Sequence, residues 1–554
     1  MIVVQGTSDP SSSLEARFGQ LDDAHDFLIN GWLVRIALDH SHLVDQPAAS
    51  EIVIRDRPRR EGAAYAESLN GAFLILRAGP DVGLEIVLDR VGSIPVYYAI
   101  RDKQSCFSSR LLDLVRAGWH EPDSLGVLQW VCLGQPLGSQ TPIDGVRALP
   151  NAHRVICRPG EEPVATRYWR IPRATDVDGR IEDYLDETIT TLRQAHNRAA
   201  PPAGARLAMP VTGGLDSRCN LALWADHIEG ATLFHTQDLG DFELPIAEQI
   251  ARELSKKLVV YDSTDWLRAG PRMDLRQETG EFNAAHWRLV DTARRLAEEH
   301  GTTATVDGFF QDFLFKASFV RDDSTEALVA QQLGNARYNA RMLGLQDGQA
   351  ALKGLESSIE ATILSYGDCA WAASQDYYLD NRSRRLVYSI VRLNQNHLDV
   401  RTPGMDHDLM DFAFRLPKSL RKRSLLYRHV INALSPQLAA INYDKSGLPV
   451  LDMRTRSFKR RLFSPMKRNL NHLFPNRRWL RETETNFSRL FACDATFRSR
   501  IASAVDGSRW IRDLFGARII HRLDGERRKG RPSDDLIGAL VTLAALESQG
   551  AGND

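Results

Sequence analysis

The sequence predicts a mixed α/β protein of two domains, an antiparallel β sandwich followed by a parallel sheet with a largely helical C-terminal part. Its 554 residues exceed the length of a typical domain, about 100 to 200 residues. Short apolar runs separated by turn residues fill the first part of the chain, as in antiparallel sheets. From Arg180 onward, long helical patterns alternate with isolated apolar strands, which is typical of parallel sheets with crossover helices.

The pattern changes between residues 165 and 185. We therefore assign residues 1–170 to the first domain and residues 180–554 to the second domain. The strand pattern of the first domain is clearest in three runs. They are GAFLILRAGP, GLEIVLDRVG and SIPVYYAIRD.

The second domain contains four apolar runs that we expect to form the parallel sheet. They are RLAMPV, ATLFHT, KKLVVYD and TTATVDG, and helical patterns such as IEDYLDETITTLRQAHNRAA accompany them. After Gly308 the pattern is helical almost to the end. We therefore expect almost only helices in that part of the chain.

Charge and composition exclude several classes of protein. Lys and Arg number 70 and Asp and Glu number 71, so the formal charge is −1 and no overall positive field attracts nucleic acid or anionic lipid. Hydrophobic residues make up 43% and charged residues 25%, which is typical of a globular protein. We expect neither a nucleic-acid partner nor a disordered or fibrous chain.

The six cysteines are scattered without a CxxC pair, which predicts reduced thiols and neither a disulfide framework nor a metal site. The first residues lack the charged and apolar regions of an export signal. The longest apolar run, LIGALVTLAAL, is shorter than the ~20 residues of a membrane-spanning helix. We expect a cytoplasmic protein without a membrane span.

One segment departs from the even distribution of charge. Residues 454–481 contain ten Lys and Arg residues and no Asp or Glu. Such a run is either a solvated basic helix face or a docking surface for an acidic peptide, a phosphate-bearing substrate or a partner.

The most informative motif is TGGLDS, which stands between the apolar run RLAMPV and an amphipathic helical pattern. Its members are Thr212, Gly213, Gly214, Leu215, Asp216 and Ser217. Two glycines let backbone N–H groups form an anion nest, the hydroxyls add donors, and the helix presents its positive end. Asp216 would repel phosphate unless it holds Mg²⁺, so the motif predicts an ATP–magnesium complex. The alternative is a glycine-rich turn with capping residues.

The motif is neither a Walker A loop, because no GK[ST] follows, nor the GxGxxG fingerprint. It resembles the PP-loop of enzymes that cleave ATP to AMP and pyrophosphate. Further segments resemble the class B asparagine synthetase family in the same order along the chain. They are LDRVGSIPVYYA, FSSRLLDL, TPIDGVRALPNAHRV, VDGFFQDFLF, NHLDVRTPGMDHDLMDFAFRLP and YDKSGLPV.

The resemblance implies a sandwich like that of N-terminal-nucleophile enzymes and a Rossmann-like PP-loop domain. It also implies roles for particular residues. Asp216 and Asp312 would ligate Mg²⁺. Thr236, Asp307 and Gly308 would line the adenosine pocket at the carboxyl ends of the strands, and Lys445 would neutralise the α-phosphate or the acyl intermediate.

Two departures from the family restrict the reaction. Glutamine-hydrolysing members use a cysteine at position 2 as nucleophile, and here that residue is Ile2. In GFFQD, Phe309 stands where the synthetases carry an acidic residue and β-lactam synthetases a tyrosine. We expect no glutaminase activity, and a base from elsewhere or from solvent. Glu281 and His286 are the candidates, with ordinary helix-surface residues as the alternative. The aromatic pair of GFFQD predicts an apolar mouth of the site.

The resemblance implies an ATP-dependent carboxylate–amine ligase that forms an amide through an acyl-adenylate. The hypothesis that we favour is macrolactam closure of a lasso-type precursor peptide, with a leader-handling protease as partner. The alternatives are amidation of a small metabolite or sugar acid, β-lactam closure, and a scaffold that binds a nucleotide without turnover. Thiolation of transfer RNA would require reactive cysteines, and we expect Cys219 to belong to the core instead.

Overall fold

The computed structural model describes most of the chain. The described residues are 3–9, 14, 24–29, 32–38, 43–48, 51–56, 69–79, 83–174, 178–237, 243–262, 281–316, 324–345, 349–367, 370–453, 487, 490–491, 494–526 and 534–550. The basic segment 454–481 lies outside them. None of the helices in these ranges has the length and hydrophobicity of a membrane-spanning segment.

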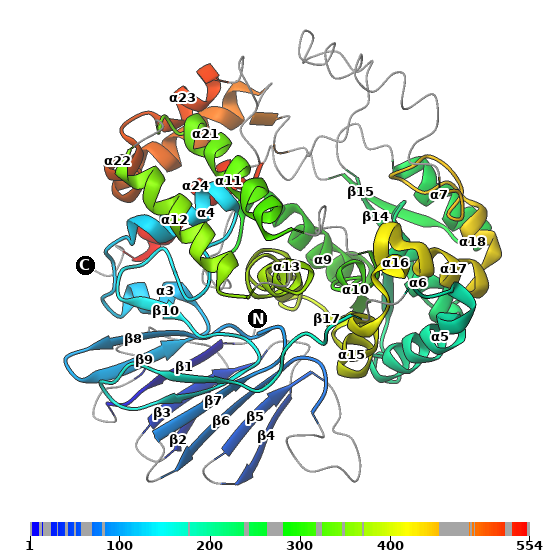
Figure 1. The fold of residues 1–554 in the computed structure, drawn as a ribbon, viewed down its shortest axis with the longest axis horizontal. Helices are drawn as coiled ribbons and strands as arrows, with labels where there is room; N and C mark the ends of the chain where they lie inside the picture. Colours follow the sequence, from blue (N-terminus) through cyan, green and yellow to red (C-terminus); the bar gives the residue numbers. More distant parts are fainter. Residues whose placement is uncertain are drawn as a thin grey trace.

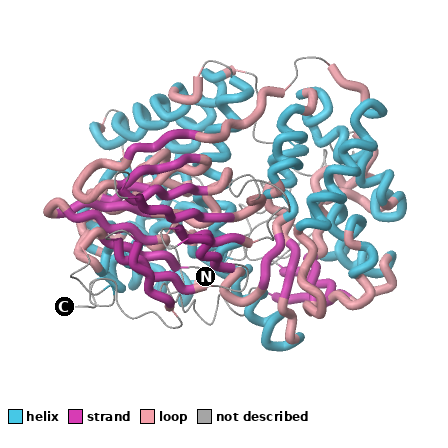
Figure 2. The backbone as a smooth tube through the Cα atoms, turned by 90° about the horizontal axis from the view of Figure 1, so that it is seen from below, coloured by secondary structure: helices cyan, strands magenta, loops and turns pink. Residues whose placement is uncertain are grey.

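The N-terminal part forms two antiparallel sheets that pack face to face (Figures 1 and 2). The first has the order β10 (Val146–Ala148), β8 (Tyr97–Arg101), β9 (Gln104–Ser108), β1 (Val3–Thr7), β3 (Trp32–Ala37) and β2 (His25–Ile29). The second has the order β12 (Val164–Arg167), β11 (His153–Cys157), β7 (Gly83–Leu88), β6 (Phe73–Gly79), β5 (Glu51–Arg55) and β4 (Leu43–Ala48).

The sandwich encloses a core of side chains from both sheets. Val34 of β3 and Phe107 of β9 are buried together with Ile54 of β5, Leu74 of β6 and Ile86 of β7. This core follows from the alternation of apolar residues along each strand, because alternate side chains point to the same face. The three runs that predicted strands form β6, β7 and β8, so these predictions are confirmed.

A five-stranded parallel sheet forms the centre of the second part. Its order is β15 (Leu258–Asp262), β14 (Thr232–Gln237), β13 (Leu207–Pro210), β16 (Ala304–Val306) and β17 (Asp399–Arg401). The chain passes outward from β13 through β14 to β15 and then continues on the other side with β16 and β17. The connections after β13 and β16 therefore diverge, and in such sheets the carboxyl ends at this point form the binding crevice.

After Gly308 the described elements are helices apart from the strand β17, which agrees with the expectation of almost only helices. The three residues of β17 pair in parallel with β16, from Ala304 opposite Asp399 to Val306 opposite Arg401. A strand this short carries no periodicity of its own, so the sequence pattern did not identify it.

Helices surround the parallel sheet and fill the space above the sandwich (Figure 1). Those near the sheet are α5 (Ile181–Arg198), α6 (Leu215–Leu223), α7 (Leu244–Glu253), α9 (Trp287–His300), α10 (Gln311–Lys316), α14 (Tyr388–Asn394), α15 (His407–Arg415), α16 (Lys418–Arg421), α17 (Leu425–Leu434) and α18 (Pro436–Ala440). The others are α3 (Leu111–Arg116), α4 (Ser124–Leu133), α11 (Thr325–Met342), α12 (Ala350–Leu364), α13 (Ala370–Tyr377), α21 (Ala495–Gly507), α22 (Arg509–Phe515), α23 (Ile519–Glu526), α24 (Asp534–Gly550) and the π-helix η4 (Tyr378–Val387).

The two parts share one hydrophobic core. Helix α4 of the N-terminal part packs against α11, α12 and α24, which come from the C-terminal part. Its Trp130 is buried in the same cluster as Leu355 of α12 and Leu540 of α24. The predicted boundary at residues 170–180 thus separates the sandwich from the parallel sheet along the chain. Helices that precede and follow this boundary nevertheless pack against one another.

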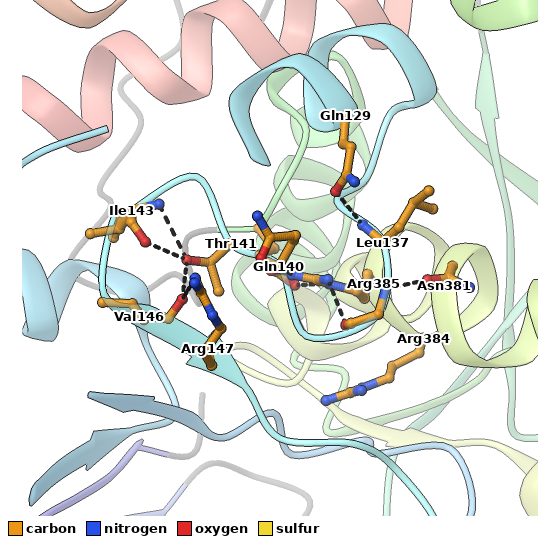
Figure 3. A network of polar contacts seen from close by, with 12 residues as sticks. Gln129, Leu137, Gln140, Thr141, Ile143, Val146, Arg147, Asn381, Arg384 and Arg385 are labelled. Carbon is orange, nitrogen blue, oxygen red and sulfur yellow. Dashed lines mark hydrogen bonds and ion pairs between the residues drawn. The ribbon is translucent and has the colours of Figure 1, made fainter. Parts of the chain in front are cut away.

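A polar network fastens the loop after α4 to the π-helix (Figure 3). Arg385 donates hydrogen bonds to the carbonyl oxygens of Gly138 and Gln140, at 3.1 and 2.6 Å, and its Nε atom donates to Oε2 of Glu281 at 2.9 Å. Asn381 accepts a hydrogen bond from the N–H of Gly138 at 2.8 Å. Because Arg385 and Glu281 are both almost fully buried, neither charge has water as an alternative partner.

Substituting Arg385→Met is expected to destabilise the protein strongly, because it leaves the carboxylate of Glu281 buried without its cation. Removing one partner of a buried ion pair costs about 3–5 kcal/mol. A large decrease in melting temperature, followed by tryptophan fluorescence, would agree with this prediction. The control is Arg180→Met, which breaks an exposed pair with Asp183 and should leave the melting temperature unchanged. Equal effects of both substitutions would contradict it.

Candidate functional site

The TGGLDS motif forms the turn between β13 and α6, as its sequence context predicted. Its hydroxyls organise the turn: Gly214 N–H donates to Oγ1 of Thr212 at 3.1 Å, and the hydroxyls of Thr212 and Ser217 lie 2.9 Å apart. Gly214 is the N-cap of α6, and no side chain caps it. The positive end of the helix therefore faces the crevice at the carboxyl edge of the sheet.

A carboxylate already occupies part of this nest. The N–H of Gly213 donates to Oε2 of Glu243 at 3.1 Å, from the residue that precedes α7. The backbone of the loop therefore binds an anionic oxygen in this structure, as the motif predicted on chemical grounds. Sequence reasoning missed Glu243, because nothing in the sequence relates it to the loop.

Two glycines allow the close packing of the site. A Cβ atom on Gly213 would lie 2.6 Å from Cβ of Asp444, and one on Gly308 would lie 2.8 Å from Cβ of Asp216. Both distances are shorter than real Cβ contacts. Gly213 thus brings the segment around Asp444 against the loop, and Gly308 brings the end of β16 against α6.

The two predicted metal ligands lie on either side of a lysine. Asp216 forms an ion pair with Lys316, whose side chain is 8% exposed. Burial opposes the charge of Lys316, but the carboxylates of Asp216 and Asp312 outweigh this effect and raise the pKa of the ammonium. Asp312 is half-buried, and this burial raises the pKa of its carboxyl although the charges of Lys316 and Lys445 act in the opposite direction.

Lys445 reaches the same place from a tight loop. The N–H of Tyr443 donates to the carbonyl of Leu448 at 2.8 Å, and that of Gly447 donates to the carbonyl of Tyr443 at 2.7 Å, which closes the loop beneath an exposed Lys445. The N–H of Asp444 donates to the carbonyl of Gly213 at 3.1 Å. The structure therefore brings Lys445 together with the TGGLDS loop and Asp312.

The buried Arg218 of α6 joins the TGGLDS loop to the segment that leads to Lys445. Its guanidinium donates to the carbonyl oxygens of Leu438 and Ile441 at 2.7 Å each, and to those of Asn442 and Gly213 at 2.6 and 3.2 Å. The four oxygens belong to the TGGLDS loop and to the segment that leads to Lys445. Burial lowers the pKa of Arg218 to about 10, which leaves it charged at neutral pH. Arg218 follows the motif directly, but three of its partners, Leu438, Ile441 and Asn442, are more than 200 residues away.

A cavity of about 320 Å³ adjoins the loop at the carboxyl ends of β13, β14 and β16. Thr212, Thr236 and Asp307 form part of its lining, so three of the predicted nucleotide-binding residues share one cavity. Apolar residues line much of the rest. They include Leu289, Leu296, Ile390 and Leu398. Polar groups beside the loop and an apolar interior are suited to a ligand with a flat apolar portion and a polar tail.

Asp307 is half-buried in the wall of the cavity. Its carboxylate accepts a hydrogen bond from the N–H of Phe309 at 2.7 Å. Burial raises the pKa of Asp307 to about 6, and the nearby charges of Asp216 and Asp312 act in the same direction.

The residues present fit a divalent cation at Oδ1 of Asp216, the carboxylate oxygen that does not pair with Lys316. Oδ2 of Asp216 pairs with Lys316, whereas Oδ1 is buried and has no hydrogen-bond partner within the described residues. An orphaned carboxylate oxygen beside the carboxylate of Asp312 is a donor set that Mg²⁺ prefers. Over those same residues, no group of three or more His, Cys, Asp or Glu side chains is arranged to hold a metal without another ligand. Mg²⁺ would therefore need oxygen ligands from a substrate or water.

The two candidate bases lie elsewhere. Glu281 is buried in the ion pair with Arg385 that fastens the loop after α4. Nε2 of His286 lies 3.4 Å from Oδ1 of Asp535, at the start of α24. Neither residue lines the cavity beside the loop. The buried ion pair with Arg385 favours a structural role for Glu281.

Phe309 and Phe310 do not form an apolar mouth, and this prediction was wrong. Their exposed fractions are 6% and 1%, and both belong to the main hydrophobic core. The ring of Phe309 packs edge-on against Tyr388, with 4.9 Å between centroids, and that of Phe310 packs against Phe313 at 5.0 Å. The backbone of Phe310 has a φ of 73°, and this left-handed conformation turns the chain so that both rings point inward.

The core assignment of Cys219 is confirmed. Its thiol is fully buried, and burial raises its pKa to about 12. A thiol with such a pKa is protonated at neutral pH and is not a nucleophile.

Sequence reasoning also missed Lys316, which is the nearest cation to Asp216. Lys316 ends the run QDFLFK, one turn after Asp312, and a spacing of four residues on a helix places two side chains on one face. This spacing was the signal that could have identified it.

No family model and no curated protein matches the chain. Among solved structures, it is similar to a U34-tRNA thiolase, NcsA from Methanococcus maripaludis, described with its 4Fe-4S cluster. The identity is 12%, the match covers 54% of this chain and 77% of that chain, and the TM-score is 0.22. A TM-score this low supports neither a shared fold nor a shared activity.

Substituting Asp307→Asn is expected to stabilise the protein at neutral pH. The folded pKa of about 6 exceeds the unfolded value of about 3.9, so the contribution of Asp307 to stability is present at low pH and is lost as the pH rises through 6. The amide avoids this loss and still accepts the hydrogen bond from Phe309. Urea unfolding should show a gain of up to about 3 kcal/mol at pH 7.5 and little change near pH 4. A gain independent of pH would contradict the assignment.

Substituting Lys316→Met is expected to make the stability depend on Mg²⁺, because Asp216 and Asp312 then lack their resident cation. An ion that binds only the folded state raises the melting temperature as its concentration rises. The slope of melting temperature against Mg²⁺ concentration should be larger in the variant than in the wild type. The control is Lys418→Met, which removes a cation remote from Asp216. Equal slopes for Lys316→Met and wild type would show that the carboxylates do not need a cation between them.

Proposed function

We propose that the chain is an ATP-dependent carboxylate–amine ligase that forms an amide and releases AMP and pyrophosphate. The observation that carries this proposal is the convergence of Asp216, Asp312, Lys316 and Lys445 on the TGGLDS loop, beside a cavity at the carboxyl edge of the parallel sheet. Two carboxylates, two ammonium groups and an anion nest are the parts that a phosphate chain with a metal ion requires.

The chain's own residues would bind ATP in two places. The adenosine would occupy the cavity lined by Thr236 and Asp307, with its apolar interior against the base. The phosphates would then extend over the loop, where the N–H of Gly213 now binds Glu243. Lys316 and Lys445 would neutralise phosphate oxygens. Mg²⁺, when bound, would neutralise further charge on the departing pyrophosphate.

The proposed reaction has two steps. An oxygen of the substrate carboxylate attacks the α-phosphorus of ATP, the bond from that phosphorus to the bridging oxygen breaks, and pyrophosphate leaves. An amine nitrogen then attacks the carbonyl carbon of the acyl-adenylate, AMP leaves, and the nitrogen loses a proton to solvent. Catalysis would come mainly from the positioning of two substrates and from the neutralisation of phosphate charge.

Within this class, we propose ring closure of a lasso-type precursor peptide, with an Asp or Glu side chain as the acyl group and the N-terminal amine as nucleophile. The support is the sequence resemblance, in which Ile2 stands where glutamine-hydrolysing synthetases carry their cysteine nucleophile, so the attacking nitrogen would be an amine of the substrate rather than ammonia from glutamine. The burial of Phe309 and Phe310 removes the argument from an apolar mouth. Amidation of a small metabolite shares every step above and differs only in the substrates. A leader-handling protease remains a proposed partner.

The test is the exchange of labelled pyrophosphate into ATP, assayed with small carboxylic acids and with peptides that carry Asp or Glu. Substituting Asp216→Ala or Asp312→Ala should lower the exchange rate at least ~100-fold, because each removes charge stabilisation at the phosphates. Lys445→Ala should lower the rate and preserve ATP binding. The control Asp183→Ala, on an exposed helix start, should exchange like the wild type.

The substrate profile distinguishes the alternatives. Peptide-dependent exchange with a product that has lost one water supports ring closure, and exchange with small acids alone supports amidation of a metabolite. ATP binding without exchange under any substrate would establish the non-catalytic scaffold and overturn the enzyme proposal.

A further inference from the structure

A second cavity lies between α4, α11, the π-helix and the start of α24. Its volume is about 410 Å³, and it shares no lining residue with the cavity beside the TGGLDS loop. Its walls are mainly carboxamides, tyrosines and two charged groups. The cavity is partly open to solvent, and four elements contribute residues to its walls.

Two buried acceptors in this wall have no partner. Oε1 of Gln135 and Oδ1 of Asn339 are inaccessible to solvent and accept no hydrogen bond within the described residues. Gln135 is only 3% exposed. Nδ2 of Asn339 donates to the carbonyl of Cys132 at 2.8 Å, which fixes the direction of its oxygen. An unsatisfied buried acceptor costs about 1–3 kcal/mol. Solvent does not reach either oxygen in this structure, so a ligand in the cavity would contact them only after these side chains move.

The charges of the cavity are of both signs and do not neutralise each other directly. Arg382 of the π-helix makes no hydrogen bond or ion pair within the described residues, although it acts electrostatically on Asp535. Asp535 lies at the start of α24 and pairs with His286 at 3.4 Å. The hydrogen bond and the charge of His286, together with Arg382, hold the pKa of Asp535 below its usual value despite burial. The carboxylate is therefore ionised at neutral pH.

The wall that carries Gln135 is held in place by the network of Figure 3. Leu137 N–H donates to Oε1 of Gln129 at 2.9 Å, and the next residue, Gly138, is bound to Asn381 of the π-helix. Asn381 precedes Arg382, so the same contact positions both sides of the cavity. A site with fixed walls loses little free energy in ordering its groups around a ligand.

We propose that this cavity binds a free α-amino acid. The carboxylate of the ligand would pair with Arg382, its ammonium would face Asp535, and its hydrogen-bond donors would satisfy Gln135 and Asn339 once these side chains move. The single unpaired guanidinium matches one carboxylate, whereas Asp535 disfavours a phosphate or a dianion. The volume is that of a small-molecule site and admits one amino acid with its side chain. This inference does not depend on the proposed ligase activity.

Thermal shift followed by isothermal titration calorimetry with each of the twenty standard L-amino acids tests the proposal on the full chain. At least one amino acid should raise the melting temperature and bind. Its N-acetylated and carboxyl-amidated forms should bind at least ~10-fold more weakly, because each removes one of the two charges. If none of the twenty amino acids binds at a concentration of about 10 mM, the proposal is overturned, because specific sites rarely bind more weakly than this.

Arg382→Gln should weaken binding at least ~10-fold, whereas Arg180→Gln, an identical change on an exposed residue, should leave it unchanged. Gln135→Leu provides a second readout that does not require a charged group. It should raise the melting temperature of the free protein, because an apolar group replaces an unsatisfied acceptor, and should weaken binding.

Two further results would contradict the site. Amino-acid binding that survives Arg382→Gln, or that ATP abolishes by competition, would place the ligand elsewhere. If inorganic phosphate displaced the bound amino acid as readily as a second amino acid does, the cavity would be a simple anion site. Binding that persists in Asp216→Ala supports the second cavity, whatever the result for the ligase activity.

Discussion

The ion pair between Lys316 and Asp216 is the interaction on which the candidate site depends. A buried ammonium is costly unless carboxylates surround it, and Lys316 has Asp216 in contact and Asp312 nearby. This arrangement requires α6 and α10 to approach closely, and Gly308 permits it because any side chain there would collide with Asp216. The lysine, the glycine and both carboxylates are therefore parts of one arrangement.

The charges at this place do not balance. Asp216, Asp312 and Asp307 contribute three carboxyl groups against the two ammonium groups of Lys316 and Lys445, and the pKa of the half-buried Asp307 is raised to about 6. Burial is the main cause of the raised pKa values of Asp307 and Asp312, and the neighbouring carboxylates act in the same direction. A cation is the partner that would relieve the excess of carboxyl groups, and an anion such as phosphate would bind only together with one.

The sequence predicted those features that depend on interactions between neighbouring residues. It did not predict features that depend on contacts between residues far apart in the chain. The TGGLDS turn, its flanking strand and its helix were predictable because glycine, hydroxyl and capping preferences act within a few residues. The ion pair of Glu281 with Arg385 joins residues 104 positions apart, and nothing in the sequence of either segment indicates this pairing. The inward direction of Phe309 depends on the left-handed backbone of Phe310. Lys316 had a helical spacing from Asp312 that could have revealed it.

The π-helix explains why the second cavity keeps its unpaired groups. Asn381 and Arg385, four residues apart, both face the loop after α4 and are fully bonded there. Tyr378 and Arg382 have the same spacing and line the cavity instead. A π-helix is rare and its wide turns are frequent at functional sites. The hydroxyl of Tyr378 accepts a hydrogen bond from Gln332 at 3.2 Å, whereas Arg382 makes no hydrogen bond or ion pair within the described residues. Arg382 is therefore the charged group of this helix that a ligand in the second cavity would neutralise.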